Sequence, residues 1–383
     1  MTPTTQTTEV VQLLAQLISI NSVNPSLVPG AMGEPEIATF IEGWLQGKGF
    51  ETHWLEATPG RPSVVGIARG TGGGKSLLFN GHIDTVGVIG METPFTPRIE
   101  GNRMYGRGAY DMKGGVAAML IAAARAKELN LRGDVMVACV SDEEYASVGS
   151  FELTQHFRAH AAIVTEPSSL KAVVAHKGFV WLELETHGKA AHGSRPDLGV
   201  DAIAKMGKVL VGLEKLDLEM RAAPPHKLLG SGSIHASLIS GGQELSSYPA
   251  SCKLSIERRT IPGESHVMVE QQVRKILDSI SASDPNFSYT LTMQLERKPH
   301  QIAEDDPTLK ILLQKARELL ERVPELEGAP FWTDCAVLSA AGIPTFLFGP
   351  HGEGAHAEQE WVDLESVEQC ADIYLQTAQE FCR

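Results

Sequence analysis

Helical and strand patterns alternate along the chain from Glu9 to Val164. Helices are expected at Glu9–Ile20, Glu34–Gly49 and Met112–Leu129, and strands at 50–56, 62–68, 75–80, 134–140 and 161–164. The last two strands are short and apolar throughout, as in strands covered on both faces. This alternation predicts an α/β layer built on a largely parallel sheet.

The middle of the chain has a different order of elements. Strands are expected at 178–186, 233–239, 253–259 and 287–295, and helices at 199–216 and 265–281. That order, β-α-β-β-α-β, is typical of the ferredoxin-like α+β arrangement. A helix at 307–321, a strand at 345–348 and a helix from Leu364 then resume the first pattern. We therefore expect one domain formed by 1–176 and 297–383, with a second domain, 177–296, inserted into it.

Composition narrows the class of protein. A length of 383 residues exceeds the usual size of a single core, and a net charge of −14 argues against a nucleic-acid partner. The first twenty residues lack a basic segment, which indicates an amphipathic helix and not a signal peptide, and no apolar run is long enough to span a membrane. Five scattered cysteines without a C-x-x-C motif favour reduced thiols in a cytoplasmic protein.

The segment 79-FNGHIDTVG-87 places a histidine and an aspartate at the end of an apolar strand. Residues two apart in an extended segment point the same way, so His82 and Asp84 are expected side by side. A carboxylate beside an imidazole fixes its tautomer for catalysis or metal binding. An isolated H-x-D is more often a solvated turn just past a strand, so its meaning depends on partners elsewhere in the chain.

Those partners follow other predicted strands. The motif 142-DEE-144 follows the strand 134–140, Glu166 follows 161–164, and a glycine-rich loop leads from the strand 345–348 to His356. Asp111 begins the helix at 112–129. Ligands in open α/β sheets gather beyond the carboxyl ends of the strands. Two imidazoles and three carboxylates suit a pair of divalent ions, with one carboxylate bridging them.

Several segments together resemble the M20 metallopeptidase family. They are 81-GHIDTV-86, 105-YGRGAYDMKGG-115, 142-DEE-144, 165-TEPS-168 and 346-FLFGPHGEGAHAEQE-360. The resemblance covers nearly the whole chain in order. It implies a zinc-exopeptidase-like α/β catalytic domain and a ferredoxin-like lid that also serves dimerisation.

The resemblance also implies roles for the residues at the strand ends. His82 and Glu166 would hold one metal ion, Glu144 and His356 the other, and Asp111 would bridge the two. Asp84 would support His82, and Glu143 would be the general base. The ions would be zinc, with cobalt or manganese as alternatives.

Two further residues take implied roles from the inserted domain. His192, in 187-HGKAAHGSRP-196, corresponds to a histidine that polarises the substrate, and Arg259, in 257-ERRTIPG-263, to an arginine that binds the substrate carboxylate. Two positions depart from the family pattern, where Ser247 replaces a common Asn and Glu257 a common Asp. The first departure weakens any detailed expectation about substrate contacts.

The expected function is that of a metal-dependent amidohydrolase that removes an N-acyl group from an amino acid with a free α-carboxylate. The favoured substrate is N2-acetylornithine, in arginine biosynthesis. Succinyl-diaminopimelate desuccinylase, another N-acyl-amino-acid deacylase and a dipeptidase remain alternatives, as does a non-catalytic binding protein on the same scaffold. The expected partners are the small substrate and a second copy of the chain, joined through the lid, with no nucleic acid or membrane.

Overall fold

The computed structural model describes residues 8–383, which form two compact units. The first comprises the chain up to Val174 together with Ile302–Glu327 and Thr333–Arg383. The second comprises Ala175–Gln301 and Gly328–Trp332.

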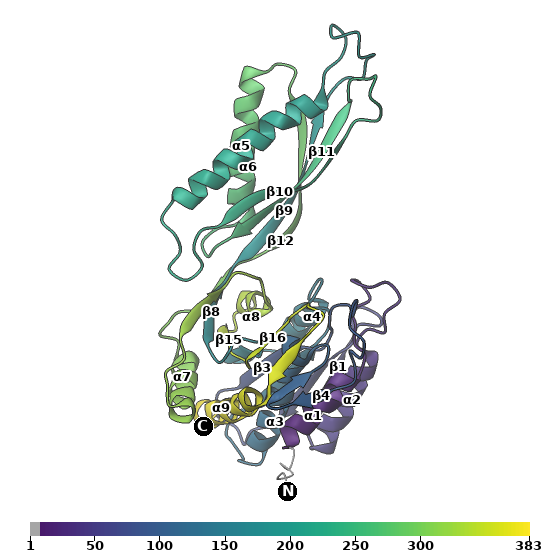
Figure 1. The fold of residues 1–383 in the computed structure, drawn as a ribbon. Coiled ribbons are helices and arrows are strands. Elements are labelled where there is room, and N and C mark those ends of the chain that lie inside the picture. Colours follow the sequence, from purple (N-terminus) through teal and green to yellow (C-terminus); the bar gives the residue numbers. More distant parts are fainter. Residues whose placement is uncertain (1–7) are drawn as a thin grey trace. The chain divides into compact units, whose positions relative to one another are not determined.

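The first unit is built on a mixed sheet (Figure 1). Its strands are β1 (Glu51–Leu55), β2 (Ser63–Ala68), β3 (Leu77–His82), β6 (Val135–Val140), β7 (Ala161–Val164), β15 (Thr345–Leu347) and β8 (Ala172–His176). They lie in the order β1-β2-β6-β3-β7-β15-β8. Strands β6, β3, β7 and β15 are mutually parallel, whereas β1, β2 and β8 pair antiparallel with their neighbours. The expectation of a largely parallel sheet therefore holds only for its centre. A short connection joins β1 to β2 and permits their antiparallel pairing, whereas β2 and β8 each pair antiparallel with a strand distant in the chain.

Helices enclose this sheet. They are α1 (Glu9–Ser19), α2 (Pro35–Gly47), α3 (Gly114–Lys127), α4 (Val148–His156), α7 (Pro307–Leu320), α8 (Cys335–Ala340) and α9 (Leu364–Phe381). Helix α3 is buried along most of its length and packs against α1, α9 and β3. At its start, a Cβ on Gly115 would lie 1.9 Å from the carbonyl oxygen of Thr165. Glycine at 115 thus allows the helix to approach the end of β7 closely.

A small sheet lies within the same unit. It contains β4 (Arg98–Glu100), β5 (Arg103–Tyr105), β16 (Gly352–Glu353) and β17 (Trp361–Asp363), in the order β16-β17-β5-β4. Trp361 of β17 pairs with Tyr105 of β5. The register brings the segment after β5 beside the segment before β17, although the two are about 250 residues apart in the chain. The segment after β5 continues into η1 (Ala109–Lys113), an irregular helical turn.

The second unit has the predicted β-α-β-β-α-β order, which confirms the ferredoxin-like expectation. Its elements are β9 (Gly178–His187), α5 (Ala202–Ala222), β10 (Ser233–Gly241), β11 (Ser251–Thr260), α6 (His266–Ser283) and β12 (Ser288–Arg297). The antiparallel sheet has the order β10-β11-β9-β12. Strands β9 and β11 alternate between buried and more exposed residues, and their buried faces share one apolar core with α5 and α6, which lie together on one side of the sheet (Figure 1).

Two short strands, β13 (His300–Gln301) and β14 (Leu326–Ala329), pair with β8. Within residues 8–383, none of the helices is sufficiently long and apolar for a membrane span. All five cysteines are buried and carry free thiols.

Candidate metal centre

Acidic and histidine residues singled out in the sequence lie at or after the ends of the four parallel strands. His82 is the last residue of β3, the 142–144 segment follows β6, Glu166 follows β7, and the chain beyond β15 leads to His356. Because these strands run in the same direction, their carboxyl ends meet at one edge of the sheet. The sheet topology therefore brings together residues that are up to 274 positions apart in the chain.

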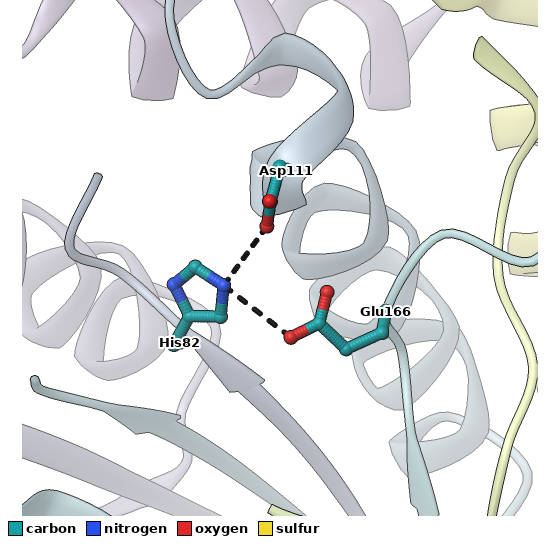
Figure 2. A group of neighbouring side chains, drawn as sticks. All are labelled: His82, Asp111 and Glu166. Atoms are coloured by element: carbon teal, nitrogen blue, oxygen red, sulfur yellow. Dashed lines mark hydrogen bonds and ion pairs between the residues drawn. The ribbon is translucent and has the colours of Figure 1, made fainter. Parts of the chain in front are cut away.

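One cluster consists of His82, Asp111 and Glu166 (Figure 2). The Nε2 atom of His82 lies 3.1 Å from Oδ1 of Asp111 and 3.4 Å from Oε1 of Glu166. His82 is 1% exposed and Glu166 7%. One ligand atom from each residue lies within 4.8 Å of the others, which is close enough for a shared cation.

A second cluster consists of Asp111, Glu144 and His356. The Nε2 atom of His356 lies 3.0 Å from Oε2 of Glu144 and 3.4 Å from Oδ2 of Asp111. Asp111 thus directs one oxygen to each histidine. This is the arrangement that a carboxylate bridging two ions requires.

The electrostatics of both clusters reflect an excess of negative charge. Burial alone lowers the pKa of His82, but the charge of Glu166 and hydrogen bonds with Asp111 and Asp84 outweigh it, so this pKa lies well above its ordinary value. Burial raises the pKa of Glu166 to about 7, and nearby carboxylates add to that effect. Hydrogen bonds with Asp111 and Glu144 raise the pKa of His356 to about 10.

The donor set fits divalent cations. Oε1 of Glu144 is buried without a hydrogen-bond partner among the described residues, and a buried acceptor of this kind is costly unless a cation or donor compensates it. Imidazole nitrogen and carboxylate oxygen are ligands of zinc and similar metals. His82 and Glu166 would hold one ion, Glu144 and His356 the other, with Asp111 between them.

Asp84 supports the site in two ways. Nδ1 of His82 lies 3.0 Å from the main-chain oxygen of Asp84 and 3.4 Å from its carboxylate. The carboxylate also accepts the backbone N–H groups of Glu143 and Glu144, at 3.2 and 3.3 Å. Asp84 therefore fixes both the imidazole and the acidic segment after β6.

Glu143 lies in neither cluster. Burial, followed by the charge of Glu166, raises the pKa of its carboxyl well above the ordinary value. Its neighbour Glu144, by contrast, is directed at His356.

A buried polar network behind Asp84 was not predicted from the sequence. Asn24 donates to Asp84 at 2.7 Å and to Asp142 at 3.0 Å, and Arg61 pairs with Asp142 at 2.8 Å and with Glu34 at 2.5 Å. These residues come from separate loops with no recognisable spacing. Only their convergence in the fold identifies them as supports for the acidic segment.

His192 and Arg259 both belong to the second unit. His192 is exposed, and the backbone N–H of Ser194 points at its Nδ1 atom at 3.2 Å. Nδ1 therefore accepts, which is the tautomer with the hydrogen on Nε2. The 191–193 segment pairs with 246–248, so Ser247 lies beside His192 along the backbone.

Arg259 lies on the exposed face of β11. Its Nε atom donates to Glu257 at 2.6 Å, and its guanidinium lies 5.1 Å from the centre of the Phe179 ring. Glu257 also accepts from the indole of Trp181 at 2.8 Å. Arg258, by contrast, is 1% exposed and points to the other face of the strand.

Comparison with known proteins defines the family. The model of peptidase family M20/M25/M40 matches residues 78–380, which span most of the chain. The chain belongs to this family. M20 membership, together with the clusters around Asp111, makes it a metal-dependent hydrolase that acts on amides.

Two curated M20-like relatives cover much of the chain. An N-formyl-4-amino-5-aminomethyl-2-methylpyrimidine deformylase of Bacillus subtilis is 28% identical, over 98% of this chain and 95% of its own length. An acetylornithine deacetylase of Myxococcus xanthus is 29% identical, over 84% of each. The names of the two relatives point to chemically different substrates. These comparisons therefore assign this protein to the class of amide hydrolases and leave its substrate open.

Solved structures of M20-like proteins share the fold. An aminopeptidase of Bacillus cereus superposes with a TM-score of 0.80 at 19% identity, covering 98% of each chain. A dinuclear metal-binding M20 peptidase of Bacillus subtilis gives a TM-score of 0.74 at 17% identity, covering 97% of each. The predicted M20 fold, a catalytic α/β unit with a ferredoxin-like unit, is confirmed.

Proposed function

We propose that this protein is a dinuclear amidohydrolase that removes the acyl group from an N-acyl amino acid with a free α-carboxylate. N2-acetylornithine is the favoured substrate, which would assign the protein to arginine biosynthesis in the cytoplasm. The observation that carries the proposal is the pair of ligand clusters that share Asp111, with the carboxyl of Glu143 within electrostatic contact of Glu166 and Glu144.

The metal-binding residues would be the two clusters already described, with zinc as the favoured ion. When bound, such ions polarise an amide carbonyl and make a water molecule more acidic. Glu143 would accept the proton of the attacking water and deliver it to the leaving amine. Its backbone is held by Asp84, which supports a fixed position for this exchange.

Arg259 would bind the α-carboxylate of the substrate. Glu257 holds its Nε, and the Phe179 ring supports the flat face of the guanidinium. The hydrogen bond to Glu257 uses Nε, so it does not engage the edge formed by the two terminal nitrogens. A carboxylate can pair with such an edge through two parallel hydrogen bonds.

His192 would donate to the oxyanion that forms when the amide carbonyl is attacked. Its assigned tautomer presents an Nε2–H donor, which suits this role. We further propose that the protein is a homodimer and that His192 acts in the partner's site. The edge strand β10 supports this proposal, because Leu238 and Ile239 are 72% and 55% exposed on it.

A second candidate is the deformylation of an aminomethylpyrimidine. It is favoured by the deformylase relative, which matches nearly the whole chain, and by the Phe179–Trp181 pair, whose ring centres are 5.2 Å apart. Trp181 is 45% exposed, so it offers a face on which a pyrimidine ring could stack. Such a substrate has no α-carboxylate and would not need Arg259 in the proposed role.

A hydrolysis panel separates these candidates. It should contain N-acetylornithine, N-succinyl-diaminopimelate, N-acetylmethionine, several dipeptides and the N-formyl aminopyrimidine. We expect the highest kcat/KM for N-acetylornithine. A preference for the pyrimidine would replace the proposal with deformylation, and a preference for a dipeptide would replace it with peptidase activity.

Metal analysis tests the dinuclear site independently of the substrate. Protein purified without chelator should contain about two divalent ions per chain. A chelator should remove these ions, and amide hydrolysis should be lost at the same time. Failure of every amide in the panel despite bound metal would favour a binding protein on the M20 scaffold.

A further inference from the structure

Glu360 is a buried carboxylate that belongs to neither ligand cluster. Its side chain has no exposed surface, and it lies four residues after His356, just before β17. The sequence analysis quoted it within the glycine-rich segment but assigned it no role. Its contacts connect the two parts of the chain that supply Asp111 and His356.

Four N–H groups point at the two oxygens of Glu360. Oε1 accepts the backbone N–H groups of Tyr110 and Asp111, both at 2.9 Å. Oε2 accepts the backbone N–H of Gly108 and Nη1 of Arg107, both at 2.8 Å. A carboxylate has about four acceptor sites, so Glu360 is fully occupied and unsuited to bind a metal itself.

The backbone around Asp111 explains the need for such an acceptor. Asp111 and Met112 have φ/ψ angles of −113°/96° and −132°/32°, so the chain departs from helical geometry there. Backbone N–H groups in a buried irregular segment lack regular helical acceptors and need other partners. Glu360 supplies these partners and holds the backbone that carries the shared ligand.

Arg107 extends the contact to the histidine loop. It is 2% exposed, its Nη1 binds Glu360, and its Nη2 donates to the carbonyl oxygen of Ala357 at 2.9 Å. Ala357 follows His356, whose backbone has a φ of 62° and whose side chain is 57% exposed. More than half of this side chain is exposed, so the position of the imidazole depends on how the loop backbone is fixed as well as on its contacts with Glu144 and Asp111.

We propose that Glu360 and Arg107 are positioning residues that set the separation between Asp111 and His356. They would thereby set the affinity of the second cluster, the one that contains His356, for its metal ion. Glu360 holds the backbone of Asp111, and Arg107 holds the loop of His356 through Ala357. The first cluster also contains Asp111, but its other two ligands, His82 and Glu166, are fixed at the ends of β3 and β7, so it depends on this pair through one residue and not two. This inference rests on the proposed two-metal site.

The test is a metal titration of the apoprotein with Zn²⁺ or Co²⁺ in competition with a chelator. Arg107→Lys retains the positive charge. A single ammonium group cannot, however, bind Glu360 and Ala357 at the same time in the way that the two terminal nitrogens of the guanidinium do. We expect it to weaken the second equivalent by about 10–100-fold, the usual effect of losing a residue behind a metal ligand, with a much smaller change in the first. Glu360→Gln should weaken the second cluster more strongly, with a smaller loss at the first, because Asp111 belongs to both. Glu358→Gln, the same change at an exposed position of the same loop, should leave both affinities unchanged.

The outcomes separate this inference from the proposed function. If wild-type protein binds fewer than two ions, the dinuclear proposal itself fails. If wild-type protein binds two and Arg107→Lys binds both with unchanged affinity, the pair has only a structural role and the inference is overturned. Thermal unfolding of each apoprotein shows whether the variant is folded. If Glu360→Gln does not fold, the result for Arg107→Lys alone decides. An equal loss at both sites in Arg107→Lys would also contradict the proposed selectivity.

Discussion

Two adjacent glutamates after β6 have different surroundings, although they are identical in type. Glu144 is directed at His356, while Glu143 stands outside both ligand clusters. Asp84 accepts both backbone N–H groups, so the two side chains start from one fixed segment and diverge. This divergence supports the proposal that Glu144 binds metal and Glu143 moves a proton.

Substitution of the two glutamates should therefore have different effects. Glu143→Gln should retain both metal ions while losing about 10²–10⁴ in kcat, the usual range for general acid–base catalysis. Glu144→Gln is the matched variant and should lose one metal equivalent. Steady-state kinetics and metal analysis on the same preparations provide the measurement. Loss of metal from the Glu143 variant would mean that the two roles have been exchanged.

Arg259→Met should raise KM for substrates with a free α-carboxylate by about tenfold to a hundredfold, because a charge-assisted hydrogen bond contributes about 1.5–3 kcal/mol. The corresponding substrate amides should be affected little. Lys253→Met removes the same charge from the same strand and serves as the control. An equal loss on acids and amides would show that Arg259 does not anchor the carboxylate.

At the scale of elements, helix α3 approaches the end of β7 closely, next to a residue of the first ligand cluster. Gly115 in α3 faces the carbonyl oxygen of Thr165, the residue before Glu166. A methyl group there would meet backbone atoms, which cannot rotate away. Helix α3 and the end of β7 would have to separate, and Glu166 would move with the strand.

Gly115→Ala is therefore expected to destabilise the protein by about 1–3 kcal/mol, the usual effect of inserting atoms into a close-packed core. Gly43→Ala is the matched control, because Gly43 lies inside α2 with open space around the added Cβ. That variant should be more stable by about 0.5–1 kcal/mol, since alanine favours the helix. Chemical denaturation of the metal-free proteins measures both free energies of unfolding. Equal effects at the two positions would contradict the close-approach interpretation.

The long elements could be predicted from sequence because each carries its own pattern. Strands β3, β6 and β7 are continuous apolar runs, and β9 and β11 alternate. The short strands β4, β5, β16 and β17 were missed, because two or three residues carry no periodicity. The antiparallel flanks of the main sheet were missed as well, since pairing direction is decided by chain connections and not by composition.

The candidate site was predictable to a similar degree. Polar residues at strand ends stand out beside apolar runs, so His82 and Glu166 were found. Asn24, Arg61 and Glu360 lie in loops without a pattern, and their importance becomes visible only through hydrogen bonds with distant residues. Sequence thus locates groups near the chemistry more readily than the groups that hold them.

At the scale of the whole molecule, the two units carry different parts of the proposed chemistry. The metal clusters lie in the first unit, and His192 and Arg259 in the second. The proposed homodimer would allow the second unit of one chain to complete the site of its partner.

Mixing two inactive variants tests this arrangement. Glu143→Ala and His192→Ala should each be inactive, but their heterodimer would contain one site with both wild-type residues. Random exchange of subunits should restore activity towards about a quarter of the wild-type value, since half of the dimers would carry one intact site in two. Each variant incubated alone is the control. No recovery after verified exchange would place His192 in its own chain's site or outside catalysis.

The burial of the cysteines has a consequence for how the two units can be observed separately. Cys252 lies in the second unit, and Cys139, Cys335, Cys370 and Cys382 lie in the first. Burial raises the pKa of each thiol, to about 12 for Cys382, so the native protein offers little thiolate to an alkylating reagent.

Each thiol therefore becomes reactive only when its own unit opens. Alkylation of Cys252 reports the unfolding of the second unit, and alkylation of the other four cysteines reports that of the first. Pulse alkylation at increasing denaturant concentration, read by peptide mass spectrometry, should give one transition for Cys252 and a separate one for the other four. Coincident transitions would show that the two units unfold as a single cooperative body.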